Sequence, residues 1–173
     1  MSILKLLGLG GAPATGGPGD TDTVRRIAAE LDRLDPDRAR YIAAFAYILG
    51  RVAIADRGIS DAETRTMERI VTERGGLPET QAIMVVQLAK SQNRLFGGTE
   101  DFLVAREFGL MATREQKLAL LDCLFAVSAA DRSITVIEDN EISRIAQSLT
   151  LEHSDLVRAR LAYKEYLRVL QIG

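Results

Sequence analysis

Apolar residues recur at helical spacing over most of this chain. Val24, Ile27, Ala28, Leu31 and Leu34 follow one another at short helical intervals, which is the pattern of a helix that buries one face. Further helices are predicted over about 36–55, 60–75, 78–88, 99–108, 113–130, from 135 onward, and over about 154–170. No strand-like alternation of useful length interrupts them. The pattern predicts an all-α fold, a single compact bundle of about seven to eight helices.

The bundle should contain an internal duplication. Segment 49–75 returns as 124–150 at a constant offset of 75 residues, with nine identities in 27 positions, Arg69 and Arg144 among them. Each copy begins in a helix that is apolar nearly all round, continues through an acidic loop, and enters a second helix. Such a repeat predicts pseudo-two-fold packing that places the two loops in related positions.

Composition limits the class of protein. The chain has 173 residues, of which 47% are hydrophobic and 27% are charged, as in an ordinary soluble domain. A net charge of −2 argues against a nucleic-acid partner, because such proteins carry a clustered basic surplus. The single cysteine, Cys123, excludes an intrachain disulfide, lies in an apolar run and should be a buried hydrophobe. The composition indicates a cytoplasmic protein.

The N-terminal residues differ from the rest. Residues 3–9 are apolar but too short to span a bilayer, and residues 10–19 are rich in glycine and proline, as in a flexible linker. We therefore divide the chain into a flexible segment, 1–20, and a helical domain, 21–173. Plain disorder is the favoured state of the first segment, since so short a helix is marginal alone. Contact of residues 1–9 with a membrane surface or a partner is the alternative.

The acidic loops have a structural interpretation that needs no ligand. Ser60 with Glu63, and Thr135 with Glu138, both form the S/T-x-x-E pattern of a capping box. In that motif the hydroxyl accepts from the third helical N–H and the glutamate accepts from the N–H of the capping residue. The sequence therefore predicts a helix start at each of these positions.

Asp56 and Asp131 precede the two boxes at matched positions. Each can bond to backbone amides ahead of it in an Asx turn. Each also follows the C-terminal end of a long apolar helix, where the helix dipole disfavours an anion. A carboxylate repeated at such a place suggests a compensating partner: backbone amides, a neighbouring arginine, or a cation.

The cation interpretation can be checked by spacing. Asp56, Ser60 and Glu63 match the fifth, ninth and twelfth positions of an EF-hand loop, but Val52 and Ile54 occupy its first and third ligand positions. The second copy has Val127 and Ala129 there, so neither loop is an EF-hand. A metal site would need carboxylates from both copies, which favour calcium, magnesium or manganese. The candidate ligands are Asp56, Glu63, Asp131 and Glu138.

The doubled A-D-x-x-I-[ST]-x-x-E motif resembles that of the tellurite-resistance TerB-like family, usually close to A-D-G-x-I-x-x-x-E. The likeness covers about residues 35–170 and includes the stretch from Phe102 to Leu149. It implies a compact helical bundle with a divalent-metal site at the same four carboxylates. It also implies an accessory or sensing role in chemical stress, exerted through protein partners and without catalysis.

Two departures from the family pattern affect the predicted affinity for a divalent cation. Arg57 and Arg132 stand where the family usually has glycine, with Gly58 displaced by one position and Ser133 in its place in the second copy. An arginine beside each aspartate can pair with it and weaken divalent binding by about 1 kcal/mol. The alternative function is therefore a metal-independent protein-interaction scaffold, or a co-chaperone-like adaptor, whose loops are only helix caps.

Catalytic signatures are lacking. The lone His153 should lie on the surface, and the chain has none of the common nucleophile, zinc-protease or phosphate-loop motifs in a plausible context. We predict that the protein is not an enzyme.

Overall fold

The structure, a computed structural model, describes residues 25–26, 29–53, 60–92 and 101–168. The predicted flexible segment, 1–20, and the end of the last predicted helix, at about 170, lie outside these ranges. A helical stretch over 29–33 precedes the named helices. These are α3 (Pro36–Ala53), α4 (Asp61–Gly75), α5 (Glu79–Gln92), α6 (Asp101–Met111), α7 (Arg114–Ser128), the 3-10 turn η1 (Ala129–Asp131), α8 (Val136–Ser148), α9 (His153–Leu161) and the 3-10 turn η2 (Lys164–Tyr166).

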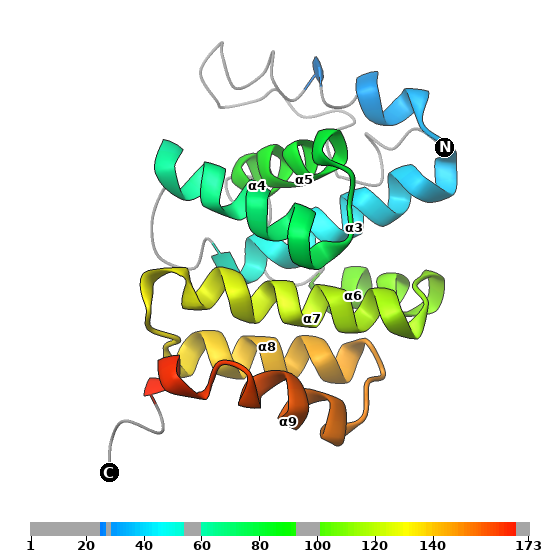
Figure 1. Cartoon of the computed structure of the whole chain (residues 1–173). Coiled ribbons are helices and arrows are strands. Elements are labelled where there is room, and N and C mark those ends of the chain that lie inside the picture. The colour runs from blue at the N-terminus through cyan, green and yellow to red at the C-terminus, as the bar shows by residue number, and fades with distance from the viewer. Residues whose placement is uncertain (1–24, 27–28, 54–59, 93–100, 169–173) are drawn as a thin grey trace.

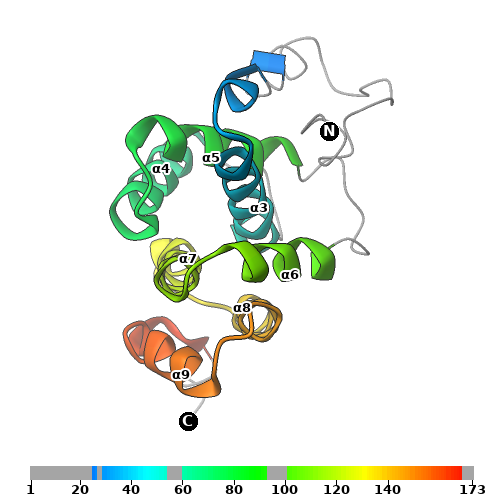
Figure 2. The same ribbon diagram turned by 90° about the vertical axis from the view of Figure 1, so that its right-hand side faces the viewer.

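The helices are arranged in three tiers that both views show (Figures 1 and 2). Helices α3, α4 and α5 form one end, α6 and α7 the middle, and α8 and α9 the other end. Helix α3 packs against α5 and α6, α4 packs against α7, and α7 in turn contacts α8 and α9. The predicted all-α bundle is confirmed over the described ranges.

The two helices predicted to be apolar all round do supply the core. In α3 an unbroken run of ten residues, 41–50, is buried, and α7 buries most of its second half. Phe45 of α3 packs edge-on against Phe108 of α6, with ring centroids 6.2 Å apart. The Phe45 ring also explains Gly75, because a Cβ there would lie 3.0 Å from the ring. Close packing thus requires the glycine that ends α4.

The second helices of the two repeated segments contact helices of both segments. Helix α4 packs on α7, whereas α8 contacts α3, α6 and α7. The duplication itself remains a prediction from sequence.

The last predicted helix is wrong in its extent. It was expected to continue to about 170, but α9 ends at Leu161, and η2 follows after a short turn. The chain turns there so that the Tyr163 ring stacks on Phe125, at 5.8 Å between centroids and 14° between planes, and so that Leu167 is buried at 1% exposure. Burial of these two side chains outweighs continued helical hydrogen bonding.

Smaller differences concern helix boundaries. Helix α6 continues to Met111, three residues beyond its expected end, and α5 continues to Gln92. Helix α7 ends at Ser128 and its last predicted turn is 3-10, which is common at helix ends. Among the described helices, none combines the length and apolar composition needed to cross a membrane.

Candidate functional site: the two acidic loops

The start of α4 is a complete capping box. Ser60 has extended backbone angles, its Oγ accepts from the Glu63 N–H at 3.2 Å, and the Ser60 N–H donates to Glu63 Oε2 at 2.7 Å. The hydrogen bond from the Ser60 backbone lowers the pKa of the Glu63 carboxyl, because it stabilises the charged form. The matched aspartate of this loop, Asp56, lies outside the described residues.

The start of α8 repeats the same geometry. The Thr135 N–H donates to Glu138 Oε2 at 2.8 Å, and the Glu138 N–H donates to Thr135 Oγ1 at 3.2 Å. The Thr135 hydroxyl adds a third bond to Glu138 Oε2 at 3.0 Å. Both predicted capping boxes are therefore confirmed, and both glutamates hold a helix N-terminus in place.

Asp131 is held by the backbone ahead of it. Its Oδ1 accepts from the Ser133 N–H at 3.0 Å, which is the Asx turn that the sequence suggested. Within this turn Arg132 has a left-handed backbone, with φ 66°. The glycine of the family pattern falls at this position, so the local geometry explains why glycine suits it.

A contact that the sequence does not predict supports the second loop from behind. Ile134 and Leu167 form an isolated parallel β-bridge, with Ile134 N–H donating to Tyr166 O at 2.7 Å and Arg168 N–H donating to Ile134 O at 3.1 Å. The Arg168 Nε also donates to Ser133 Oγ at 2.6 Å. The segment after α9 therefore immobilises the loop from Ser133 to Thr135.

An ion pair joins the end of α3 to the middle of α8. Arg51, in the last turn of α3, donates from Nη2 to Glu141 Oε1 of α8. Glu141 Oε2 lies 3.6 Å from Arg144 Nη1. The side chains of Arg51 and Glu141 are only 14% and 23% exposed, so water screens their attraction weakly.

The predicted metal ligands can be compared with this geometry. Glu63, Asp131 and Glu138 each accept local hydrogen bonds through one oxygen, and the other oxygen makes none in the described part of the chain. Over those same ranges, however, no three His, Cys, Asp or Glu side chains gather closely enough to hold a metal ion. Since Asp56 is not described, the four-carboxylate site stays a prediction.

The structure also places Cys123 and His153, the two other residues that the sequence analysis considered. Cys123 is fully buried, and this burial raises the pKa of its thiol to about 12, which keeps it protonated and unreactive. Its interpretation as a buried hydrophobe is confirmed. His153 is exposed at the start of α9, as predicted.

The described residues define an all-α domain with matched capping boxes at the starts of α4 and α8, the second of which follows the Asx turn of Asp131. The sequence matches the family model of the tellurite resistance protein TerB over residues 40–161, more than two thirds of the chain. The chain therefore belongs to the TerB family, as the doubled motif suggested. No curated protein and no solved structure matches it significantly.

Proposed function

We propose that this chain is an accessory or sensing module of a chemical stress response of the tellurite type, which acts through protein partners and not as a catalyst. The observation that carries the proposal is the TerB match over residues 40–161. A cytoplasmic location fits the single buried Cys123, because thiols stay reduced there.

The sensing input that we propose is a divalent cation, calcium, magnesium or manganese, bound by Asp56, Glu63, Asp131 and Glu138. This proposal is supported by the hydrogen bonds of Glu63, Asp131 and Glu138. Each of these carboxylates uses one oxygen in local hydrogen bonds, so its other oxygen is available to a cation. Carboxylate oxygens are the ligands that these hard cations prefer. Bound between the loops, the ion would stabilise both helix starts at once.

Isothermal titration with each of the three ions tests this site. Binding by the wild type that is lost in Asp56→Ala with Asp131→Ala supports it. No heat at millimolar ion, or unchanged binding in the double variant, rejects the cation site.

The alternative, a metal-independent interaction scaffold, is favoured by one specific observation. Both capping boxes are fully formed by protein atoms alone, so the glutamates have a role without metal. Glu63→Gln separates the two functions, because glutamine also serves a capping box but lacks the charge that a cation needs. The scaffold function requires that the substitution cost little stability and that the chain bind no ion before or after it. Asp61→Asn, exposed in the same helix turn, is the matched charge control.

The cellular role can be tested separately. Loss of the chain should reduce survival on tellurite, and the wild type should restore it. If Glu63→Gln with Glu138→Gln restores survival equally well, the cation is not needed in the cell. If loss of the chain changes nothing under tellurite, the proposed stress role is wrong.

A further inference from the structure

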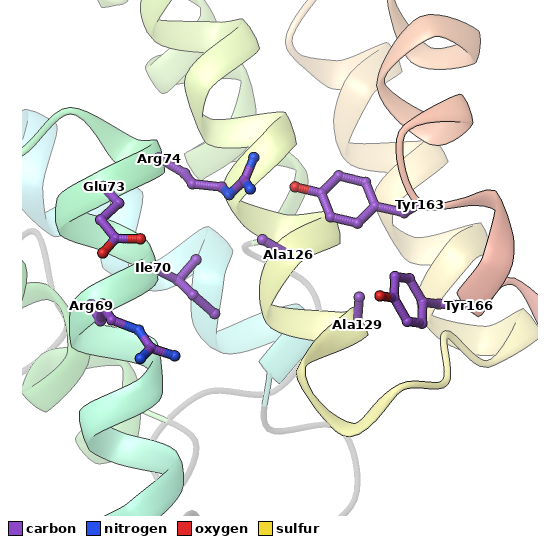
Figure 3. Close-up of a pocket in the computed structure, with 8 residues that line it drawn as sticks. All are labelled: Arg69, Ile70, Glu73, Arg74, Ala126, Ala129, Tyr163 and Tyr166. Atoms are coloured by element: carbon purple, nitrogen blue, oxygen red, sulfur yellow. The ribbon is translucent and has the colours of Figure 1, made fainter.

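A surface pocket of about 380 Å³ lies between α4, the end of α7 and the segment after α9. Its size is within the range of small-ligand sites. Figure 3 shows its walls, with arginines on the α4 side and two tyrosines facing them. The lining residues are Arg69, Ile70, Glu73, Arg74, Ala126, Ala129, Tyr163 and Tyr166.

Arg69 carries a charge that no other described residue neutralises by an ion pair. Its repeat counterpart, Arg144, lies 3.6 Å from Glu141, one turn earlier in α8. The residue one turn before Arg69 is Thr66, whose hydroxyl donates to the Ala62 carbonyl instead. The duplication kept this arginine but not its acidic partner, and its side chain lines the pocket (Figure 3).

The wall beside Arg69 is held rigid. Arg74 Nη1 donates to Asp122 Oδ2 at 3.1 Å, and the Tyr163 hydroxyl donates to Asp122 Oδ1 at 2.8 Å. The Arg74 guanidinium lies 5.9 Å from the centroid of the Tyr163 ring. The pKa of the Tyr163 hydroxyl is raised, mainly by burial and then by its bond to Asp122, so it remains a donor. Asp122 thus pairs with Arg74. Glu73, four positions after Arg69 on α4, also lines the pocket, but the structure shows no ion pair between these two described side chains.

The remaining walls are apolar or aromatic. In Figure 3, Ile70, Ala126 and Ala129 lie between the arginines of α4 and the two tyrosines, and the Tyr166 hydroxyl points toward Ala129. Glu73, exposed on α4, adds one negative charge to the same lining. It disfavours a ligand with two negative charges more than a ligand with one.

We propose that this pocket binds a single carboxylate carried on an aromatic or apolar body. Arg69 holds the carboxylate through charge-assisted hydrogen bonds. The Tyr166 hydroxyl offers a second donor, and the apolar lining residues Ile70, Ala126 and Ala129 contact the body of the ligand. The site is separate from the capping boxes and does not depend on a cation.

Two kinds of ligand have one carboxylate on an aromatic body: a small aromatic acid, and a partner peptide with a glutamate beside an aromatic residue. We would titrate the full chain, without added divalent ions, with 3-phenylpropionate and with acetyl-Glu-Phe-amide, and follow the amide NMR signals of Ala126 and Ala129. Saturable changes in chemical shift are expected with one of the two probes, and the probe that binds more tightly identifies the kind of ligand. 3-Phenylpropionamide, which lacks the charge, should produce no comparable shift.

Variants make the assignment specific. Arg69→Gln should weaken binding about tenfold, as expected for the loss of a hydrogen bond to a charged group, and Tyr166→Phe should weaken it less. Arg65→Gln, exposed one turn earlier in α4, removes the same charge outside the pocket and should have no effect. Equal weakening by Arg65→Gln and Arg69→Gln, equal binding of the neutral amide, or no saturable shift at millimolar probe would overturn the proposal. Because no cation is added, its failure would leave the cation site untouched.

Discussion

Ile134 and Leu167 pair as two parallel extended residues, one in the second acidic loop and the other beyond the last helix. The bridge uses the Ile134 N–H and C=O, at 2.7 Å and 3.1 Å from Tyr166 O and Arg168 N. Both side chains are about 1% exposed. The segment after α9 therefore closes the core and also fixes the loop that carries Asp131.

Leu167→Ala should lower the free energy of unfolding by about 2–4 kcal/mol, because it removes buried contacts and leaves a cavity. Urea denaturation monitored by circular dichroism measures the change. Leu161→Ala, the same substitution at a residue that is 59% exposed, should stay within about 0.5 kcal/mol of the wild type. Equal effects of the two substitutions would show that the segment after α9 does not close the core.

The ion pair between α8 and α9 should contribute more to the free energy of unfolding than the ion pairs on the surface do. Arg160 donates from Nε and Nη2 to the two oxygens of Asp139, at 3.0 Å each, and Asp139 is only 7% exposed. Asp139→Ala should cost about 2–3 kcal/mol in unfolding free energy, since a desolvated bidentate pair is broken.

The matched comparison is Glu30→Ala. The Glu30–Arg33 pair is 53% and 76% exposed, so its loss should cost less than about 0.5 kcal/mol. If Asp139→Ala lowers the free energy of unfolding no more than Glu30→Ala does in the same denaturant titration, the α8–α9 pair contributes to the specificity of packing and little to stability.

Arg132 occupies a backbone conformation that suits glycine, with φ 66°. Arg132→Gly should leave stability unchanged or raise it by up to about 1 kcal/mol, because relief of the left-handed strain opposes the added entropy of the unfolded chain. Arg144→Gly, in the interior of α8, should instead cost about 1 kcal/mol. Thermal unfolding of both variants compares them directly, and a clear loss with Arg132→Gly would show that the guanidinium itself stabilises the loop.

Asp155 should make part of the stability pH-dependent. Hydrogen bonding from Arg114, at 2.5 Å, is the main reason that its pKa lies below the ordinary value of 3.8, and the Glu152 N–H adds to it. A group whose pKa is depressed on folding stabilises the protein above its unfolded pKa, and this stabilisation is lost as pH falls through the folded pKa.

Asp155→Asn removes that titration. Stability measured from neutral pH down through pH values below 3.8 should fall less steeply in the variant than in the wild type. Asp61→Asn, at an exposed acid without such a partner in the described structure, removes the same charge and is the control against which the effect of Asp155→Asn is compared. Parallel curves for wild type and Asp155→Asn would contradict the role of Arg114.

The sequence predicted the helices where local chemistry decides them. Ser60, Thr113 and Thr135 start helices because each has a Glu or Gln three positions later, and a capping box needs only neighbours in the chain. The apolar runs of α3 and α7 predicted the core for a similar reason, since a helix without a polar face must be buried.

The candidate site was predictable only in part. The capping roles of Glu63 and Glu138 follow from spacing, and the doubled motif pointed to the TerB family. The pocket lined by Arg69, Tyr163 and Tyr166 had no such signal, because its walls come from segments far apart in the chain. Only the loss of an acidic partner for Arg69, visible when the two copies are aligned, could have drawn attention to it.

The sequence by itself determined the all-α class, the buried helices, the two capped loops and the family. Each of these depends on residues a few positions apart, where helical period and hydrogen-bond reach are set by covalent geometry. Only the tertiary structure decided that α9 stops at Leu161 and that Leu167 pairs with Ile134. The reason is that a helix continues only while its local bonds outweigh burial elsewhere, and burial depends on which distant segments the folded chain brings together.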